Sequence, residues 1–126
     1  MSLVSCTGGY PIERDATGWW SWTASTLECL YRVTPDSYVA SARFEYLTTG
    51  AERRVTLRVG STEQAVTLSS AVGWQQSAPV VLRPGLTRVA FHEVGGPPPV
   101  QLSAQDSRRA SFAIKNLRFE ISGAVR

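Results

Sequence analysis

The fold is decided by one stretch near the end of the chain, Asp106-Ser107-Arg108-Arg109-Ala110-Ser111-Phe112-Ala113-Ile114-Lys115-Asn116-Leu117-Arg118-Phe119-Glu120-Ile121. Apolar residues occupy every second position from Ala110 to Ile114, which is the period of a β-strand with one face on a core. The alternation resumes one step out of phase at Leu117, as happens where an inserted residue near Asn116 forms a β-bulge. A long final strand with a bulge favours a two-sheet sandwich over an open meander.

Shorter runs along the chain show the same period of two. In the run 39–47, Ala40, Ala42, Phe44 and Tyr46 share one face, which we expect to lie in the core. Further strands are predicted at residues 27–33, 53–60, 64–68, 77–82, 86–94 and 100–104. The inward residues of the second and third of these are Val55, Leu57, Val59, Val66 and Leu68.

Turn residues separate these runs. Pro84-Gly85 fits the central positions of a type II turn, because glycine tolerates the positive φ needed there. Pro97-Pro98-Pro99 lack the N–H groups that a central strand pairs, so they are expected in a stiff surface loop. No helical spacing persists beyond ten residues, so we expect an all-β fold. Two antiparallel sheets would form a sandwich or jelly roll of about eight or nine strands.

Length and charge narrow the possible functions. At 126 residues the chain is expected to form one domain, residues 1–126. The net charge is +3, and the basic residues form no block, so no nucleic-acid partner is expected. No apolar run approaches the roughly 18 residues of a membrane span, so no membrane insertion is expected. Because the first residues lack the pattern of a secretory signal, we expect a cytoplasmic location, either free or at the membrane face.

The two cysteines leave two alternatives open. Cys6 and Cys29 can form a disulfide, but in a chain that is not secreted two buried thiols are the expected state. No metal site is expected, because His92 is the only histidine and no C-x-x-C motif occurs. No glycine-rich phosphate-binding loop is present either, so no cofactor is expected.

Catalytic patterns are missing as well. His92 and Glu93 are adjacent on a predicted strand and therefore point to opposite faces. No G-x-S-x-G motif occurs, and no pair of carboxylates shares a motif. We therefore expect no catalytic residues. A small lyase or hydrolase stays an alternative that would require a cleft with perturbed carboxylates.

Three of the four tryptophans lie within four positions, in Gly18-Trp19-Trp20-Ser21-Trp22. Strand alternation puts Trp20 and Trp22 on one side and Trp19 on the other. An exposed indole offers a flat apolar surface for a sugar ring, and Trp19 is the favoured contact of the three. The alternative is that all three fill the open end of the sandwich.

The remaining candidates lie further along the chain. Trp74 is expected in a loop, beside Gln75 and Gln76, whose amides both donate and accept hydrogen bonds. Arg108 or Arg109 is expected to form an ion pair with a carboxylate such as Glu13 or Asp106, with contact to a ligand as the alternative. The candidate ligand-binding residues are Trp19, Trp20, Trp74, Gln75, Gln76 and Arg108.

The order of these motifs resembles a known kind of domain. Gly9-Tyr10-Pro11-Ile12-Glu13 is followed by the strand with Trp20 and Trp22, by Arg83-Pro84-Gly85-Leu86, and by a closing element that begins Asp106-Ser107-Arg108. This resembles the accessory β-sandwich domains of bacterial glycosyltransferases that make cell-surface polysaccharides. Those domains carry a G-W/Y-P-x-E opening, a tryptophan-containing second strand and a closing D-x-R-x-L-x-F element, although Ala110 or Ser111 stands here in place of the leucine.

The resemblance covers about residues 8–121, which are the expected ordered core. More loosely, the chain is similar to galactose-binding-like jelly rolls and to the carbohydrate-binding modules built on them. The resemblance implies a non-catalytic module that binds a glycan beside a glycosyltransferase or another glycan-processing protein. The alternative is a structural or oligomerisation module whose tryptophans are buried and whose partner is a protein.

Overall fold

The computed structural model describes residues 1–125, which form thirteen β-strands and no helix. Within these residues no helix is therefore long and apolar enough to cross a membrane. The strands are β1 (Ser2–Thr7), β2 (Glu13–Asp15), β3 (Gly18–Thr23), β4 (Thr26–Val33), β5 (Tyr38–Thr48), β6 (Arg53–Val59), β7 (Thr62–Leu68), β8 (Val72–Gln76), β9 (Val80–Leu82), β10 (Gly85–Gly95), β11 (Val100–Gln101), β12 (Arg109–Ala110) and β13 (Phe112–Ala124).

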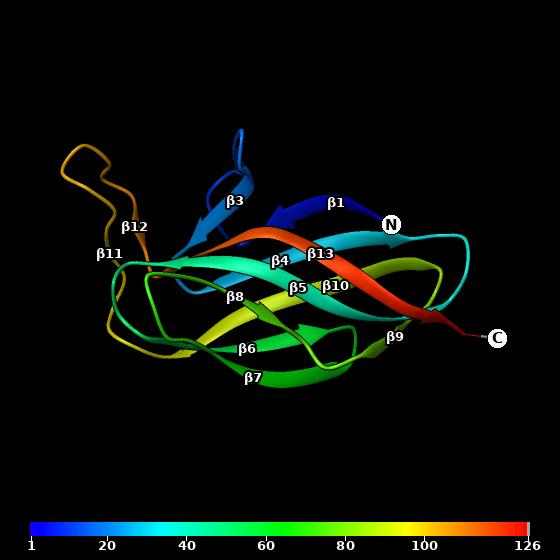
Figure 1. Ribbon diagram of the computed structural model, residues 1–126. Helices are drawn as coiled ribbons and strands as arrows, with labels where there is room; N and C mark the ends of the chain where they lie inside the picture. Colours follow the sequence, from blue (N-terminus) through cyan, green and yellow to red (C-terminus); the bar gives the residue numbers. More distant parts are fainter. Residues whose placement is uncertain (126) are drawn as a thin grey trace.

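The strands form two antiparallel sheets that face each other (Figure 1). The first sheet has the order β1-β4-β10-β6-β7, and the second has the order β2-β3-β13-β5-β8, with β9 also paired to β5. A small ribbon of β11 and β12 projects from one end of the sandwich, near β3 (Figure 1). The predicted all-β sandwich is confirmed, with more strands than the eight or nine expected.

The core lies between the sheets and is built from the alternating faces that the sequence predicted. Ala40, Ala42, Phe44 and Tyr46 are all buried, as are the predicted inward residues of β6 and β7. The rings of Phe44 and Phe91 meet edge to face across the two sheets, with centroids 4.9 Å apart. Such aromatic pairs add to the stabilisation that comes from burying apolar area.

The predicted bulge in the final strand is confirmed. β13 pairs with β3 on one side and β5 on the other, and its register with β5 shifts between Lys115 and Arg118. Asn116 adopts a φ of 51°, in the left-handed region. Its Oδ1 accepts a hydrogen bond from the Trp19 N–H at 3.0 Å, and its Nδ2 donates to the Thr17 carbonyl and the Glu45 carboxylate. The bulge therefore fixes β3 against the centre of the sheet.

Substitutions at Asn116 separate these two contributions. Asn116→Gly keeps the left-handed backbone but loses the side-chain hydrogen bonds, so we expect a loss of about 1 kcal/mol. Asn116→Ala also strains the backbone and should cost about 2 kcal/mol. Urea unfolding of the two variants measures both values. Equal stability of the two variants would show that the backbone conformation contributes nothing.

Two predicted strands differ from the structure. The run 77–82 is shortened to β9, because buried Ser77 bonds to Ala42 through its backbone and hydroxyl and Pro79 interrupts the pairing. Trp74, which was expected in a loop, lies in β8, because residues 72–76 pair with β5. The run 100–104 is shortened to β11, because the Asp106 N–H donates to the Ser103 hydroxyl at 2.9 Å and the chain turns there.

The expectation of two free thiols is wrong. Cys6 and Cys29 form a disulfide, with their Cα atoms 4.0 Å apart. The bond joins β1 to β4, where the two residues are direct cross-strand partners. Sequence patterns predicted no strand around Cys6, so nothing indicated that this register would bring the two sulfur atoms together.

Candidate functional site

Three tryptophans gather on the outer face of the second sheet. In β3, Ser21 and Thr23 are buried, so the intervening Trp20 and Trp22 point away from the core. Trp74 lies on the same outer face, because it pairs with the outward Glu45 of β5. Trp19 packs against the core on the opposite side of β3. The predicted alternation of the tryptophans is confirmed, but the expectation that Trp19 would be the exposed one is wrong.

The strand register places Glu13, Trp20, Lys115, Glu45 and Trp74 side by side in one row across this face. The Lys115 ammonium lies 5.5 Å from the centre of the Trp20 ring. At the other end of the row Trp74 is 55% exposed. The row thus combines aromatic and charged groups, which suits ligands that present both C–H and O–H groups.

Trp22 lies in the next row and forms one wall of a cleft of about 450 Å³. The other lining residues come from the end of β5 and from the β11 region: Thr48, Thr49, Val100, Gln101, Leu102, Ser103 and Asp106. We call this hollow the Trp22 cleft. It combines one indole with an amide, hydroxyls and a carboxylate, and its volume falls in the range of small-molecule sites.

A network of hydrogen bonds holds Asp106, one of the residues that line the cleft. The Arg108 guanidinium donates to both carboxylate oxygens of Glu13, at 3.2 and 3.3 Å, and to Asp106 at 2.7 Å. The Trp20 indole N–H donates to Glu13 at 3.1 Å. Arg108 also lies 5.3 Å from the centre of the Tyr10 ring. The network therefore joins the opening motif and the neighbouring tryptophan strand to the closing motif, which is 95 residues away from Glu13.

The network also sets the charge of the cleft. Hydrogen bonds from the Arg108 side chain hold the pKa of Asp106 below its usual range, and the same bonds raise the pKa of Arg108. Asp106 is thus a carboxylate at neutral pH and accepts hydrogen bonds. Among residues 1–125, no group of three or more His, Cys, Asp and Glu side chains is placed to hold a metal ion.

The other candidate residues that were predicted from the sequence lie in different places in the structure. Gln76 lies on the outer face beside Arg43, whereas Gln75 pairs with inward Phe44 and donates a hydrogen bond to the Thr67 carbonyl at 3.1 Å. Arg108 forms ion pairs with both expected partners. Trp22 was not among the candidates, although its position on the same side of the strand as Trp20 was the signal that could have found it.

Comparison by sequence gives no relative. No protein-family model matches the chain, and no curated protein matches it.

Comparison by structure gives three informative neighbours, all under 25% identical. A family 35 carbohydrate-binding module from an environmental isolate has a TM-score of 0.57 and 15% identity, over 98% of this chain and 89% of the other. The Podospora anserina GH26-CBM35 β-(1,4)-mannanase has a TM-score of 0.56 and 8% identity, over 99% and 26%. A Bacillus thuringiensis Cry1Da tryptic core variant has a TM-score of 0.61 and 10% identity, over 98% and 22%.

These neighbours establish the fold as a jelly-roll sandwich, as predicted. The chain spans about a quarter or less of the mannanase and of the Cry1Da core, but nearly the whole of the carbohydrate-binding module. The same architecture therefore occurs both as part of larger chains and in a chain of similar length.

Proposed function

We propose that this domain is a non-catalytic carbohydrate-binding module that holds a glycan in the Trp22 cleft. The observation that carries the proposal is the Trp22 indole, which forms the wall of a cleft that also contains Gln101, Ser103 and Asp106. The fold shared with the family 35 carbohydrate-binding module supports it.

The chemistry of the cleft matches that of a sugar ring. The flat face of the indole fits the C–H groups on one side of a pyranose. The Asp106 carboxylate accepts hydrogen bonds from hydroxyls, while the Gln101 amide both donates and accepts. Because the Glu13–Arg108 pair fixes Asp106, the site is organised before a ligand arrives, which lowers the entropy cost of binding.

The row from Trp20 to Trp74 extends the proposed site. Three strand spacings separate the two residues, which is about 14 Å at ~4.8 Å per strand. A longer glycan that leaves the cleft along this face would meet Trp74, but a short one would not. The Arg43 guanidinium, 3.9 Å from the centre of the Trp74 ring, holds that indole in place.

A catalytic role has less support. Among the described carboxylates with displaced pKa values, Asp15 and Asp106, both are displaced downward by hydrogen-bond donors. A general acid at neutral pH needs the opposite displacement. We therefore propose that catalysis belongs to a partner, a glycosyltransferase or another glycan-processing protein, beside which this module binds the glycan.

Calorimetric titration against gluco-, manno- and galacto-oligosaccharides of three to six residues tests the proposal. Trp22→Ala should weaken binding of every bound oligosaccharide at least tenfold, or about 1.4 kcal/mol. Trp74→Ala should weaken only the longer ones. Val81→Ala, at an exposed position at the other end of β5 from the cleft, serves as the control. The proposal fails if no oligosaccharide binds, or if folded Trp22→Ala binds as tightly as the wild type.

One observation favours a second function, that of a structural or oligomerisation module. β8 forms an edge of its sheet, and its Val72 and Trp74 side chains are 68% and 55% exposed. An exposed apolar edge strand is a template for pairing with another chain. A light-scattering mass above that of the monomer, lowered by Val72→Lys, would support this function, and a monomeric mass would count against it.

A further inference from the structure

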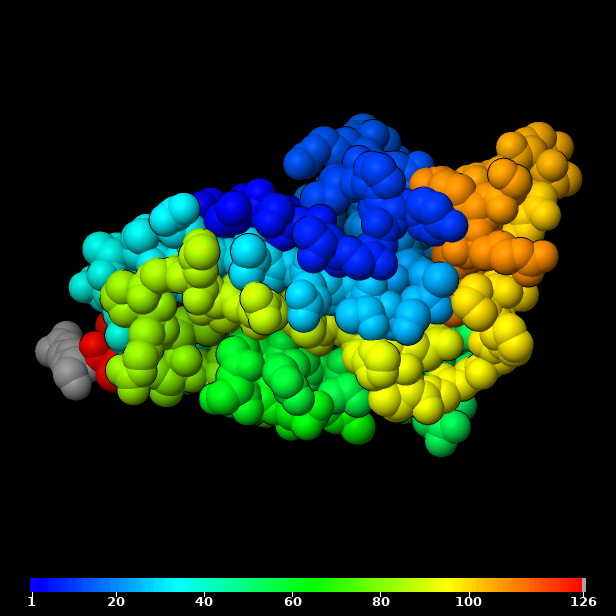
Figure 2. Space-filling model, turned by 180° about the vertical axis from the view of Figure 1, so that it is seen from behind, coloured from blue at the N-terminus to red at the C-terminus, as the bar shows by residue number. Residues whose placement is uncertain are grey.

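A larger groove lies on the opposite side of the molecule, on the outer face of the first sheet. Figure 2 shows this face, with β10 between β4 and the β6–β7 hairpin. The groove has a volume of about 550 Å³. Its polar and charged lining residues are Thr26, Glu28, Thr56, Arg58, Glu63, Arg88 and His92. None of these residues belongs to the Trp22 cleft.

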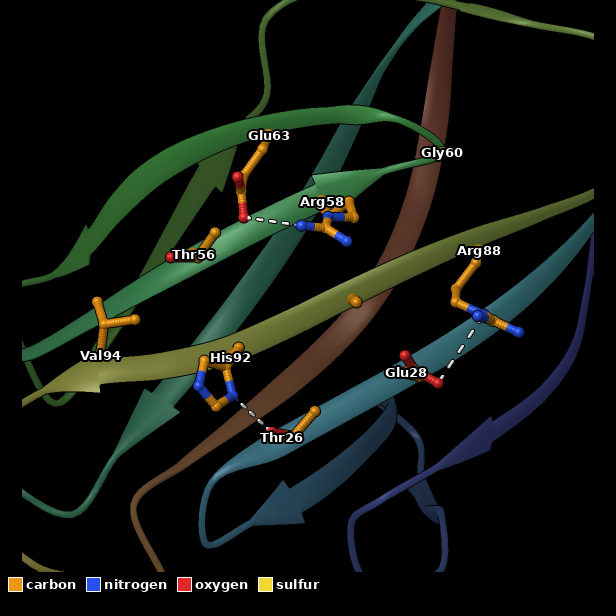
Figure 3. A pocket seen from close by; sticks show the side chains of 10 residues that line it. Thr26, Glu28, Thr56, Arg58, Gly60, Glu63, Arg88, His92 and Val94 are labelled. Atoms are coloured by element: carbon orange, nitrogen blue, oxygen red, sulfur yellow. Dashed lines mark hydrogen bonds and ion pairs between the residues drawn. The ribbon is translucent and has the colours of Figure 1, made fainter.

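The groove exists because of a small residue at its floor. Ala90 on β10 pairs with Glu28 of β4 on one side and with Arg58 of β6 on the other. Its methyl group leaves space between these two long side chains. On the walls, Arg58 bonds to Glu63 at 3.2 Å and Arg88 lies 3.8 Å from Glu28 (Figure 3). His92 Nδ1 lies 2.7 Å from the Thr26 hydroxyl at the other end of the groove.

Both arginines of the groove keep free hydrogen-bond donors. Only Nη2 of Arg58 contacts Glu63, and only Nε of Arg88 approaches Glu28. The two side chains are 58% and 64% exposed. A guanidinium has five N–H donors in a planar fork, so each can still bind an anion with two parallel hydrogen bonds.

The groove lies within a wider basic diagonal. Four arginines point outward from this sheet, in the order Arg32, Arg88, Arg58 and Arg54 from one corner to the other. Glu28 and Glu63 are the only acidic side chains that point outward from β4, β10, β6 and β7. Four guanidiniums and two carboxylates leave this face net positive, whereas the Trp22 cleft contains a carboxylate and no basic side chain.

We propose that the groove is a second glycan-binding site, selective for an acidic glycan whose carboxylates or sulfates repeat along the chain. Arg58 and Arg88 bind the anionic groups, and Thr26, Thr56 and His92 bind neighbouring hydroxyls. The inference deepens the proposed function, because it assumes that the domain binds glycans. A single-stranded nucleic acid fits the groove less well as a ligand, because no tryptophan, tyrosine or phenylalanine lines the groove to stack on a base.

Titration with tetragalacturonate and its neutral methyl ester, in 20 mM salt, tests this second site. A sulfated dextran oligomer of similar length replaces carboxylate by sulfate and identifies the preferred anion. The variants are Arg58→Ala/Arg88→Ala and, as a control with the same loss of charge, Arg14→Ala/Arg118→Ala. We expect the wild type to bind at least one acidic oligomer. The affinity should fall at least tenfold in the Arg58→Ala/Arg88→Ala variant and stay within twofold of the wild type in the control. Any binding of the neutral ester should be the same in the wild type and the groove variant.

Several outcomes would overturn the inference: no binding of either acidic oligomer, equal losses in the two double variants, or tighter binding of a single-stranded oligonucleotide of equal charge. Trp22→Ala separates this inference from the proposed function. If acidic oligomers bind normally to Trp22→Ala and no neutral glycan binds the wild type, the proposed glycan site in the Trp22 cleft is rejected and the site in the groove is supported. If neutral glycans bind through Trp22 and acidic ones do not bind the groove, the site in the Trp22 cleft is supported and the site in the groove is rejected.

Discussion

Alanine in place of Arg53 should destabilise the domain by about 3–5 kcal/mol, as expected when one partner of a buried ion pair is removed. Arg53 is fully buried at the start of β6. Its guanidinium lies 3.3 Å from Glu93, whose side chain is only 13% exposed. Without Arg53 the Glu93 carboxylate would stay in the interior with no counter-charge, and the removed side chain would leave a cavity.

Arg53 also connects the core to the Trp22 cleft. Its Nη2 donates to the Thr49 hydroxyl at 3.0 Å, and its Nη1 donates to the Pro97 carbonyl. Thr49 lines the cleft, and Pro97 begins the segment that leads to β11. The substitution should therefore weaken glycan binding at Trp22 even at temperatures where the variant stays folded.

Urea unfolding of Arg53→Ala and Arg54→Ala measures the effect, since the two residues are adjacent but Arg54 is exposed. Arg54→Ala should change stability by less than about 0.5 kcal/mol. Arg53→Met/Glu93→Leu, which removes both charges, should recover most of the loss. A loss below about 1 kcal/mol for Arg53→Ala would mean that the pair contributes little and that water reaches Glu93 readily.

The long strands and the core could be predicted from the sequence because burial leaves a period of two. β5, β6 and β13 each have one face in the core, so their apolar residues alternate over many positions. The bulge at Asn116 was also predictable, because one inserted residue shifts that alternation by one step. An ion pair of Arg108 or Arg109 with Glu13 or Asp106 was also predicted, and the structure shows that Arg108 forms it.

The shorter strands could not be predicted, because too few residues repeat. β8 has five residues, and Gly73 interrupts its pattern. Glycine is required there, because a Cβ would collide with the hydroxyl of Tyr46. The contact with Tyr46 therefore explains why residue 73 is glycine. Because glycine weakens a strand pattern, the sequence did not indicate that Trp74 lies in a strand.

The candidate site was predicted only in part, for a different reason. Alternation places Trp19 opposite Trp20 and Trp22, but it does not determine which side faces the core. That choice depends on the pairing with β13, about 90 residues away, in which buried Phe112 and Ile114 lie opposite Thr23 and Ser21. The cleft itself joins β3, the end of β5 and the β11 region, and no local pattern indicates that these segments meet.

Removal of the Cys6–Cys29 bond should cost about 3 kcal/mol, because the bond closes a loop with a sequence separation of 23 and so restricts the unfolded chain. The loss should appear in urea unfolding of the wild type with dithiothreitol and equally in Cys6→Ser/Cys29→Ser without it. Dithiothreitol should leave the double variant unchanged, which excludes a general effect of the reductant. Equal stability of reduced and oxidised wild type would contradict the prediction.

The same bond bears on where the protein works. The cytoplasmic location proposed from the sequence would keep Cys6 and Cys29 reduced, because disulfides persist mainly in oxidising compartments. β1 would then be held to β4 only by strand pairing at the edge of its sheet. Trapping free thiols with iodoacetamide during lysis, followed by mass measurement, decides between the two states. Two alkylated cysteines would support the cytoplasmic location, whereas an unmodified mass would place the domain in an oxidising compartment with its full stability.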